Sequence, residues 1–100
     1  MTRRKLRREL FNAITSLDVV RVSEIATSDP SIVNAPDSHR NVPLTEAIST
    51  GRLDLVKVLT QHGADPHHRN HGGGSLLNYA AFSGRQEIAK HLISLGVESQ

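Results

Sequence analysis

The sequence predicts an all-α protein, a short α-solenoid built from stacked helix–turn–helix units. The chain has 100 residues, of which 37% are hydrophobic and 22% charged, a composition that suits one small domain. Apolar residues and glycines recur in the same order about 33 positions apart. A unit of that length buries its apolar face only against neighbouring units, so the repeat itself predicts a stack.

Two units are clear copies of each other and a third is degenerate. Segments 44–48 and 77–81 align at an offset of 33 positions, and glycines follow each of them in register. The first unit keeps the apolar positions at an offset of 34 but has Leu17 and Asp29 where the second unit has glycine. Its matching apolar residues are Leu10, Ala13, Ile14, Val22 and Ile25, which align with Leu44, Ala47, Ile48, Val56 and Leu59.

Each clear unit predicts two short helices joined by a glycine turn. Pro43 suits the first position of a helix, where its missing N–H would have no partner anyway. Ser75 suits the N-cap of the matching helix, whereas Val42 is a poor cap. Gly51 and Gly84 permit the sharp turn between the two helices. The predicted first helices span 43–50 and 76–83, and the predicted second helices span 53–61 and 86–95.

Polar segments separate the units. Residues 29–38 and 64–74 contain Asp-Pro followed by polar residues, with glycines in the second segment, and are typical of extended turns. The predicted organisation is a basic N-terminal segment (1–8), a degenerate capping repeat (9–38) and two repeats (39–69 and 70–100), all in one domain.

The basic residues are concentrated at the N-terminus. The net charge is +2, yet five of the twelve basic residues lie in the first eight positions, and residues 9–100 hold seven basic and ten acidic residues, a net of −3. This run is either a solvated helix start, with Leu6 and Leu10 facing the core, or a docking site for an import receptor, an anionic membrane or nucleic acid. Phe11 alone follows it as an aromatic, which gives base stacking little support. The candidate electrostatic docking residues are Arg3, Arg4, Lys5, Arg7 and Arg8.

The units resemble ankyrin repeats, a family with a period of about 33 residues and a T-P-L-H-x-A motif. Segments 42–47 and 75–80 resemble that motif, and 58–65 resembles the end of a repeat. The resemblance implies helix pairs stacked side by side, hairpin-like loops at roughly a right angle to them, and protein recognition through the concave face. Thr45 and Asn78 stand in place of the motif's histidine. The polar network between repeats is therefore expected to be weaker or differently made.

Two of the three aromatic residues lie three positions apart in one predicted helix. Tyr79 and Phe82 are expected to face the concave groove as anchors for a partner, with Leu77, Ala80 and Ala81 on the buried face. The alternative is that both aromatics pack locally under the long loop. The matching residues of the preceding repeat are Glu46 and Ser49, which predicts a groove with an apolar end and an acidic end. The candidate partner-binding residues are Ser38, His39, Asn41, Glu46, Ser49, His68, Asn70, His71, Tyr79 and Phe82.

Several chemistries are excluded or disfavoured. The absence of cysteine rules out disulfides, cysteine-ligated zinc, iron–sulfur clusters and a thiol nucleophile. Residues 71–75 (His-Gly-Gly-Gly-Ser) resemble the oxyanion-hole loop of esterases, but no G-x-S-x-G elbow accompanies them. His62, His67, His68 and His71 crowd one segment near Asp65, and a loop that contacts a partner is favoured there over a zinc site. The sequence predicts no enzyme, cofactor or metal.

The predicted function is a non-catalytic protein–protein interaction module, a small adaptor or inhibitor located in the cytoplasm or nucleus. The alternative is a nuclear or nucleic-acid-associated factor that docks through its basic N-terminus. No apolar run reaches the roughly 20 residues of a membrane span. The last predicted helix carries an apolar stripe that would be partly exposed, so the sequence is either a fragment or pairs there with another protein or with itself as a homodimer. The stripe consists of Ile88, Leu92, Ile93 and Leu95.

Overall fold

The computed structural model describes residues 2–69 and 73–97. In these residues the only β-type pairing is an isolated bridge between Arg69 and Ser75. The elements, in chain order, are α1 (Arg3–Thr15), α2 (Val19–Ser28), the 3-10 helix η1 (Pro30–Asn34), α3 (Pro43–Thr50), α4 (Leu53–Gln61), α5 (Leu76–Phe82) and α6 (Gln86–Ser94).

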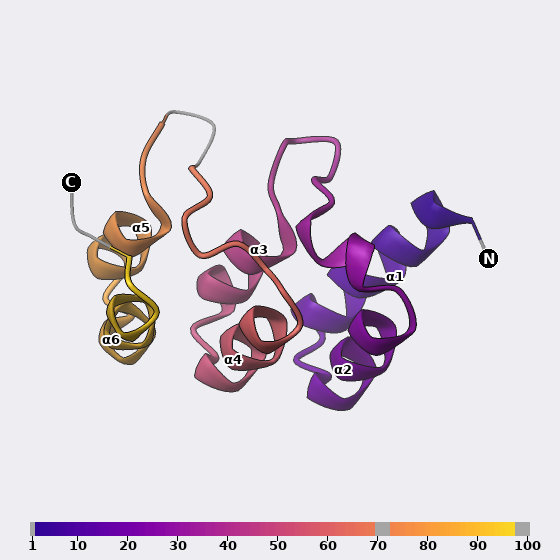
Figure 1. The fold of residues 1–100 in the computed structure, drawn as a ribbon, viewed down its shortest axis with the longest axis horizontal. Coiled ribbons are helices and arrows are strands. Elements are labelled where there is room, and N and C mark those ends of the chain that lie inside the picture. Colours follow the sequence, from indigo (N-terminus) through magenta and orange to yellow (C-terminus); the bar gives the residue numbers. More distant parts are fainter. Residues whose placement is uncertain (1, 70–72, 98–100) are drawn as a thin grey trace.

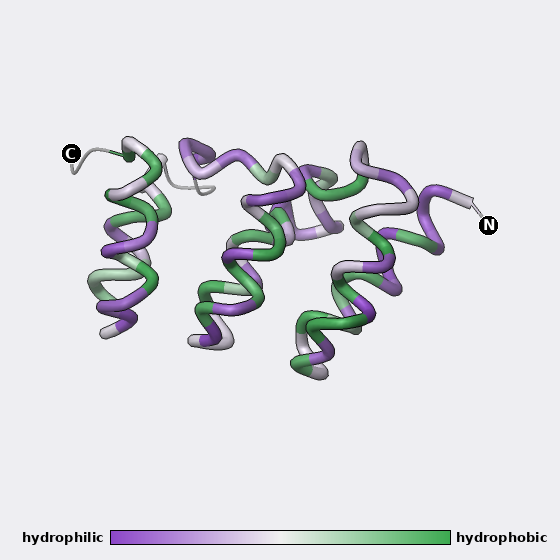
Figure 2. The backbone as a smooth tube through the Cα atoms, turned by 60° about the horizontal axis from the view of Figure 1, so that its bottom comes forward, coloured by the Kyte–Doolittle hydropathy of each residue, from purple (hydrophilic) through white to green (hydrophobic). Residues whose placement is uncertain are grey.

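The helices stand as three pairs side by side along the longest axis of a molecule measuring 39 × 25 × 21 Å (Figure 1). The loops that follow the first and second pairs project from the same side of the stack (Figure 1). Figure 2 shows apolar and polar positions alternating along each pair. This arrangement confirms the predicted short α-solenoid with hairpin-like loops.

The helix ends follow the predicted capping chemistry. Pro43 begins α3, and Val42 before it provides no side-chain cap. Ser75 caps α5, because its Oγ accepts a hydrogen bond from the backbone N of Asn78 at 3.0 Å. The bounds of α3 and α4 match the prediction, while α5 and α6 each end one residue earlier.

One element was not predicted from the sequence. Residues 29–38 were expected to form an extended turn, but Pro30–Asn34 form the 3-10 helix η1. Asp29 caps it by accepting a hydrogen bond from the backbone N of Ser31 at 3.2 Å. Ile32 and Val33 are fully buried in this short helix, so tertiary packing holds a segment that its polar flanks suggested was a loop.

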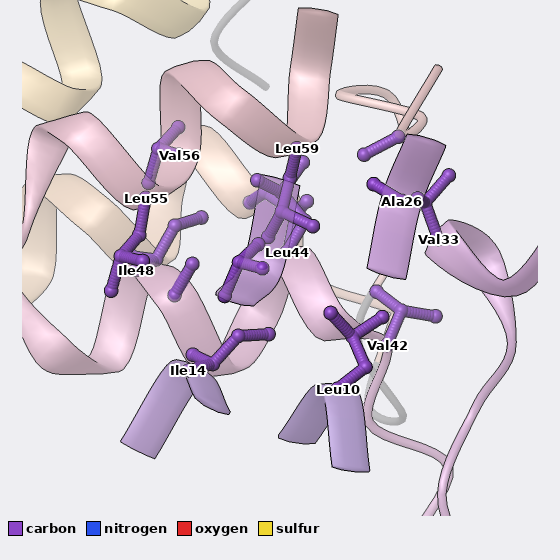
Figure 3. Packing of buried hydrophobic residues seen from close by; sticks show 14 of the residues in the cluster. Leu10, Ile14, Ala26, Val33, Val42, Leu44, Ile48, Leu55, Val56 and Leu59 are labelled. Carbon is purple, nitrogen blue, oxygen red and sulfur yellow. The ribbon is translucent and has the colours of Figure 1, made fainter. Parts of the chain in front are cut away.

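The core is one continuous cluster that passes through all three pairs. Side chains of α1, α3 and α4 meet between the helices, with Leu10 and Ile14 directed toward Leu44 and Ile48 (Figure 3). All ten apolar positions aligned between the first and second repeats are buried. The degenerate repeat therefore packs like the others, although Leu17 takes the left-handed φ of 60° that a glycine would adopt without strain.

An asparagine ties the first repeat to the second. The side-chain Nδ2 of Asn34 donates to the backbone O of Gly63 at 3.0 Å, and the backbone N of Asp65 donates to its Oδ1 at 2.8 Å. Nearby, His62 Nδ1 donates to the carbonyl of Val58 at 2.8 Å, and its Nε2 lies 3.2 Å from the Thr27 hydroxyl.

Different groups tie the second repeat to the third. Arg85 donates to the backbone O of Ser49 at 3.0 Å. His91 Nε2 lies 3.2 Å from the hydroxyl of Thr60. Thr45, at the position of the motif's histidine, has a buried Oγ1 with no hydrogen-bond partner among the described residues. The hydrogen bonds between repeats therefore use other side chains than the histidine of the family motif, as expected from its replacement in this sequence.

Gly51 and Gly84 allow the contribution of Arg85 to be isolated. Both have a φ of 77°, but a Cβ on Gly51 would lie 2.8 Å from Arg85 Nη1, whereas one on Gly84 would meet nothing within 4 Å. We expect each alanine substitution to cost about 1 kcal/mol of unfolding free energy through the left-handed backbone. Gly51→Ala should cost roughly 1 kcal/mol more because Arg85 must leave the Ser49 carbonyl. Urea unfolding measures both variants, and equal losses would contradict a role for the Arg85 contact.

The contact at His91 predicts a dependence of stability on pH. Burial, together with the charge of Lys57, lowers the pKa of His91 below its usual 6.5. Because the unfolded chain then binds more protons, the contribution of His91 to stability is complete above pH 6.5 and declines as the pH falls through the folded-state pKa. Urea midpoints should fall less on acidification in His91→Gln than in the parent protein. His39→Gln, on an exposed loop, should keep the parent slope, and an unchanged slope in His91→Gln would contradict the assignment.

Candidate protein-interaction groove

A groove of about 590 Å³ lies between α1, the loop after η1 and α3; we call it the α1 groove. Helix α1 supplies most of its lining, the loop contributes two residues and α3 contributes one. The lining residues are Arg4, Arg7, Arg8, Phe11, Asn12, Thr15, Asp37, Ser38 and Glu46.

Helix periodicity explains how α1 serves both the core and the groove. Arg4, Arg8, Phe11 and Thr15 are spaced three or four residues apart and therefore share one face of the helix. Another face carries the buried Leu10 with Ala13 and Ile14. Packing of the apolar face against α3 therefore fixes the direction of the arginine face.

The α1 groove is lined by three arginines, whereas the sequence predicted that the part of the concave groove around Glu46 would be acidic. Glu46 lies in the groove as expected of a concave residue, but it faces a cavity that three arginines also line. Among the described residues, Arg4, Arg7 and Arg8 form no ion pair, whereas Asp37 Oδ1 accepts from two backbone N–H groups of its own loop. The predicted acidic end was wrong because the sequence did not show that the N-terminal helix forms one wall of the groove.

The five N-terminal basic residues do not form one continuous docking surface. They belong to the helix α1 from its first residue, and the predicted boundary after residue 8 falls within that helix. Arg3 turns away to donate to Ser31 Oγ at 2.7 Å, and Lys5 is exposed outside the groove lining. Only Arg4, Arg7 and Arg8 share a surface with predicted partner-binding residues, namely Ser38 and Glu46.

The two aromatics of α5 differ in exposure. Phe82 is 94% exposed, so the alternative that both aromatics pack locally is wrong for this residue. Tyr79 is half-buried and packs against the core. Ala81, expected on the buried face, is exposed. Ser49, the counterpart of Phe82 in the second repeat, is also exposed, which supports a shared outward direction for this position.

The predicted loop residues are dispersed. His39 is exposed, and Asn41 is half-buried and donates its backbone N–H to Asp37 at 3.0 Å. His68 is half-buried, and its backbone N lies 3.3 Å from the carbonyl of Asp65. Asn70 and His71 lie outside the described residues.

The histidine-rich segment shows no metal site in the part of the chain that the structure describes, where no three His, Asp or Glu side chains gather. Both ring nitrogens of His62 are within hydrogen-bond distance of protein groups. This histidine therefore joins two repeats and does not project as a ligand.

Four lining residues were not singled out as a partner site from the sequence: Phe11, Asn12, Thr15 and Asp37. A signal for two of them was present, because an offset of 34 aligns Asn12 with Glu46 and Thr15 with Ser49. Extending the concave positions into the degenerate repeat would have identified this wall.

No helix in residues 2–69 and 73–97 is both long and apolar enough to cross a membrane.

Comparisons with known proteins agree with the repeat pattern. A family model described as ankyrin repeats (many copies) matches residues 44–93. Ankyrin repeat and SAM domain-containing protein 6 of Rattus norvegicus is 34% identical over 96 residues, which are 94% of this chain and 11% of that protein. Protein phosphatase 1 regulatory subunit 27 of Homo sapiens is 44% identical over 55 residues, which are 55% of this chain and 36% of that protein. The chain thus spans about a tenth to a third of the length of these relatives.

A solved structure shares the architecture. A chain from the complex of the predatory endopeptidase Bd0816 of Bdellovibrio bacteriovorus with the immunity protein Bd3460 matches with a TM-score of 0.78 and 28% identity. The match covers 90% of this chain and 47% of that one. The stacked helix pairs, their glycine turns and these similarities lead to one conclusion: the chain belongs to the ankyrin-repeat family.

Proposed function

We propose that the chain is a non-catalytic adaptor or inhibitor that binds a protein partner through its concave surface. The exposure of Phe82 carries this proposal, because a large aromatic that is 94% exposed gains by being buried against a partner. The α1 groove lies on the same row of repeat positions, since Thr15 in its lining corresponds to Ser49 and Phe82. A partner lying along the concave surface would contact both.

Similar proteins support a role in protein assemblies. One is named as a regulatory subunit of protein phosphatase 1, and the solved counterpart comes from a complex of an endopeptidase with an immunity protein. An intracellular location, in the cytoplasm or nucleus, is part of the same proposal and follows from the expectation of an intracellular partner.

The nucleic-acid alternative is less well supported by the groove. Glu46 and Asp37 lie in its lining beside the arginines and would repel a phosphate backbone. Phe11 is the one aromatic residue in this lining, which gives a run of bases little to stack on. A protein segment brings backbone N–H groups that can donate to the carboxylates of Glu46 and Asp37, which phosphate groups lack.

Affinity capture with a matched pair of variants tests the proposal. Phe82→Ser installs the residue that the second repeat carries at this position and should abolish retention of the specific partner. Val20→Ser removes another exposed apolar side chain, 70% exposed beside a hollow on α2, and should leave retention unchanged. Retention that is lost only with Val20→Ser, or that survives Phe82→Ser, would contradict binding through the concave surface.

A homodimer through the C-terminal helix is a second proposal, supported by the exposure of an apolar side chain on α6. Ile88 and Leu92 are buried in the core, but Ile93 is 58% exposed. An offset of 33 aligns Ile93 with Thr60, the residue that contacts the next repeat through His91. This position is therefore suited to contact with a further packing surface.

Sedimentation velocity over a range of concentrations tests the dimer. We expect a concentration-dependent dimer that Ile93→Gln weakens, because the substitution removes apolar area from the contact. Val20→Gln is the control for losing an exposed apolar side chain elsewhere. A strict monomer at high concentration would contradict self-association.

A further inference from the structure

We infer that the α1 groove binds an acidic segment of the protein partner, whose carboxylates pair with Arg4, Arg7 and Arg8 while an apolar side chain packs on Phe11. This inference rests on the proposed function and specifies the chemistry of the partner. It joins two sets of residues that the sequence left separate, because the groove brings the arginines of α1 together with Ser38 and Glu46.

The arginines are available for a partner. Two arginines elsewhere in the chain are engaged: Arg21 pairs with Glu9 at 2.8 Å and Arg52 with Asp54 at 2.7 Å. No such pair forms at Arg4, Arg7 or Arg8 within the described residues. Each guanidinium presents a planar set of donors that fits a carboxylate in a bidentate arrangement.

The position of these charges is unfavourable for the isolated helix. The first turn of α1 contains no acidic residue, and positive side chains there oppose the positive end of the helix dipole. Arg4, Arg7 and Arg8 are also spaced three and four residues apart, where like charges repel. A bound acidic segment would relieve both costs, so the placement disfavoured by the helix favours binding of an anion.

The dimensions and the opposite wall favour a short protein segment. A volume of about 590 Å³ accommodates a few side chains but not a folded domain. Glu46, on the α3 wall, offers acceptor oxygens to the backbone N–H groups of a peptide. Phosphate groups have no donor for Glu46, whereas the N–H groups of a peptide would offset the repulsion between Glu46 and the carboxylates of that peptide.

Fluorescence anisotropy on the full chain tests the inference. The probe is a short labelled peptide of alternating Glu and Asp around one central Leu, and the comparison probe is a single-stranded oligonucleotide of equal charge. Arg4→Gln/Arg8→Gln removes two charges from the groove. Arg3→Gln/Lys5→Gln removes two charges from the same helix outside the groove lining, and thermal unfolding confirms that both variants are folded.

We expect the acidic peptide to bind the parent chain, with affinity falling as salt rises. The groove variant should bind about tenfold more weakly, and the control variant should stay within about twofold of the parent. Phe11→Ser should also lower the affinity for this peptide. It should leave unchanged the affinity for a peptide of the same charge that lacks the central Leu.

Three results would overturn the inference: no peptide binding, equal losses in the two double variants, or tighter binding of the oligonucleotide. The last would identify nucleic acid as the ligand of the groove. These failures are distinguishable from failure of the proposed function, because partner capture depends on Phe82, which lies outside the groove lining.

Discussion

Burial of apolar helix faces between neighbouring repeats is the constraint on which the rest of the structure depends. Each helix pair has little interior of its own, and Leu10 and Ile14 of the first repeat are buried in one cluster with Leu44 and Ile48 of the second (Figure 3). The central repeat is packed on both sides. Its position therefore orients the first and third repeats, and with them every concave residue.

Polar contacts between repeats refine this packing. The two clear repeats lack the histidine of the family motif, and the buried hydroxyl of Thr45 has no hydrogen-bond partner among the described residues. Asn34 joins the first repeat to the second, and Arg85 joins the third to the second. Because these two contacts use different side chains and different carbonyls, we expect the two junctions to respond differently to substitution.

The same stacking creates the candidate binding surface. On α1, one face packs in the core. The adjacent face carries arginines that form no ion pair among the described residues and that line a groove shared with α3 and a loop. At the other end of the stack, Phe82 projects into solvent from α5. The molecule thus carries a basic groove lined mainly by α1 and an exposed aromatic on α5, and we propose that both belong to one surface that recognises a protein segment.

The sequence by itself determined the repeat period, the bounds of α3 and α4 and the burial of the ten aligned apolar positions, because these depend on local capping and on helical periodicity. Only the tertiary structure decided which charges face one another. The sequence separated Arg4 from Glu46 by one repeat, yet stacking places both in the lining of one groove. From the sequence, Tyr79 and Phe82 were expected to face the same groove. Packing against the core covers Tyr79 in part and leaves Phe82 in solvent. Periodicity sets which face of a helix is buried, whereas the neighbours of the remaining faces follow from contacts between residues distant in the chain.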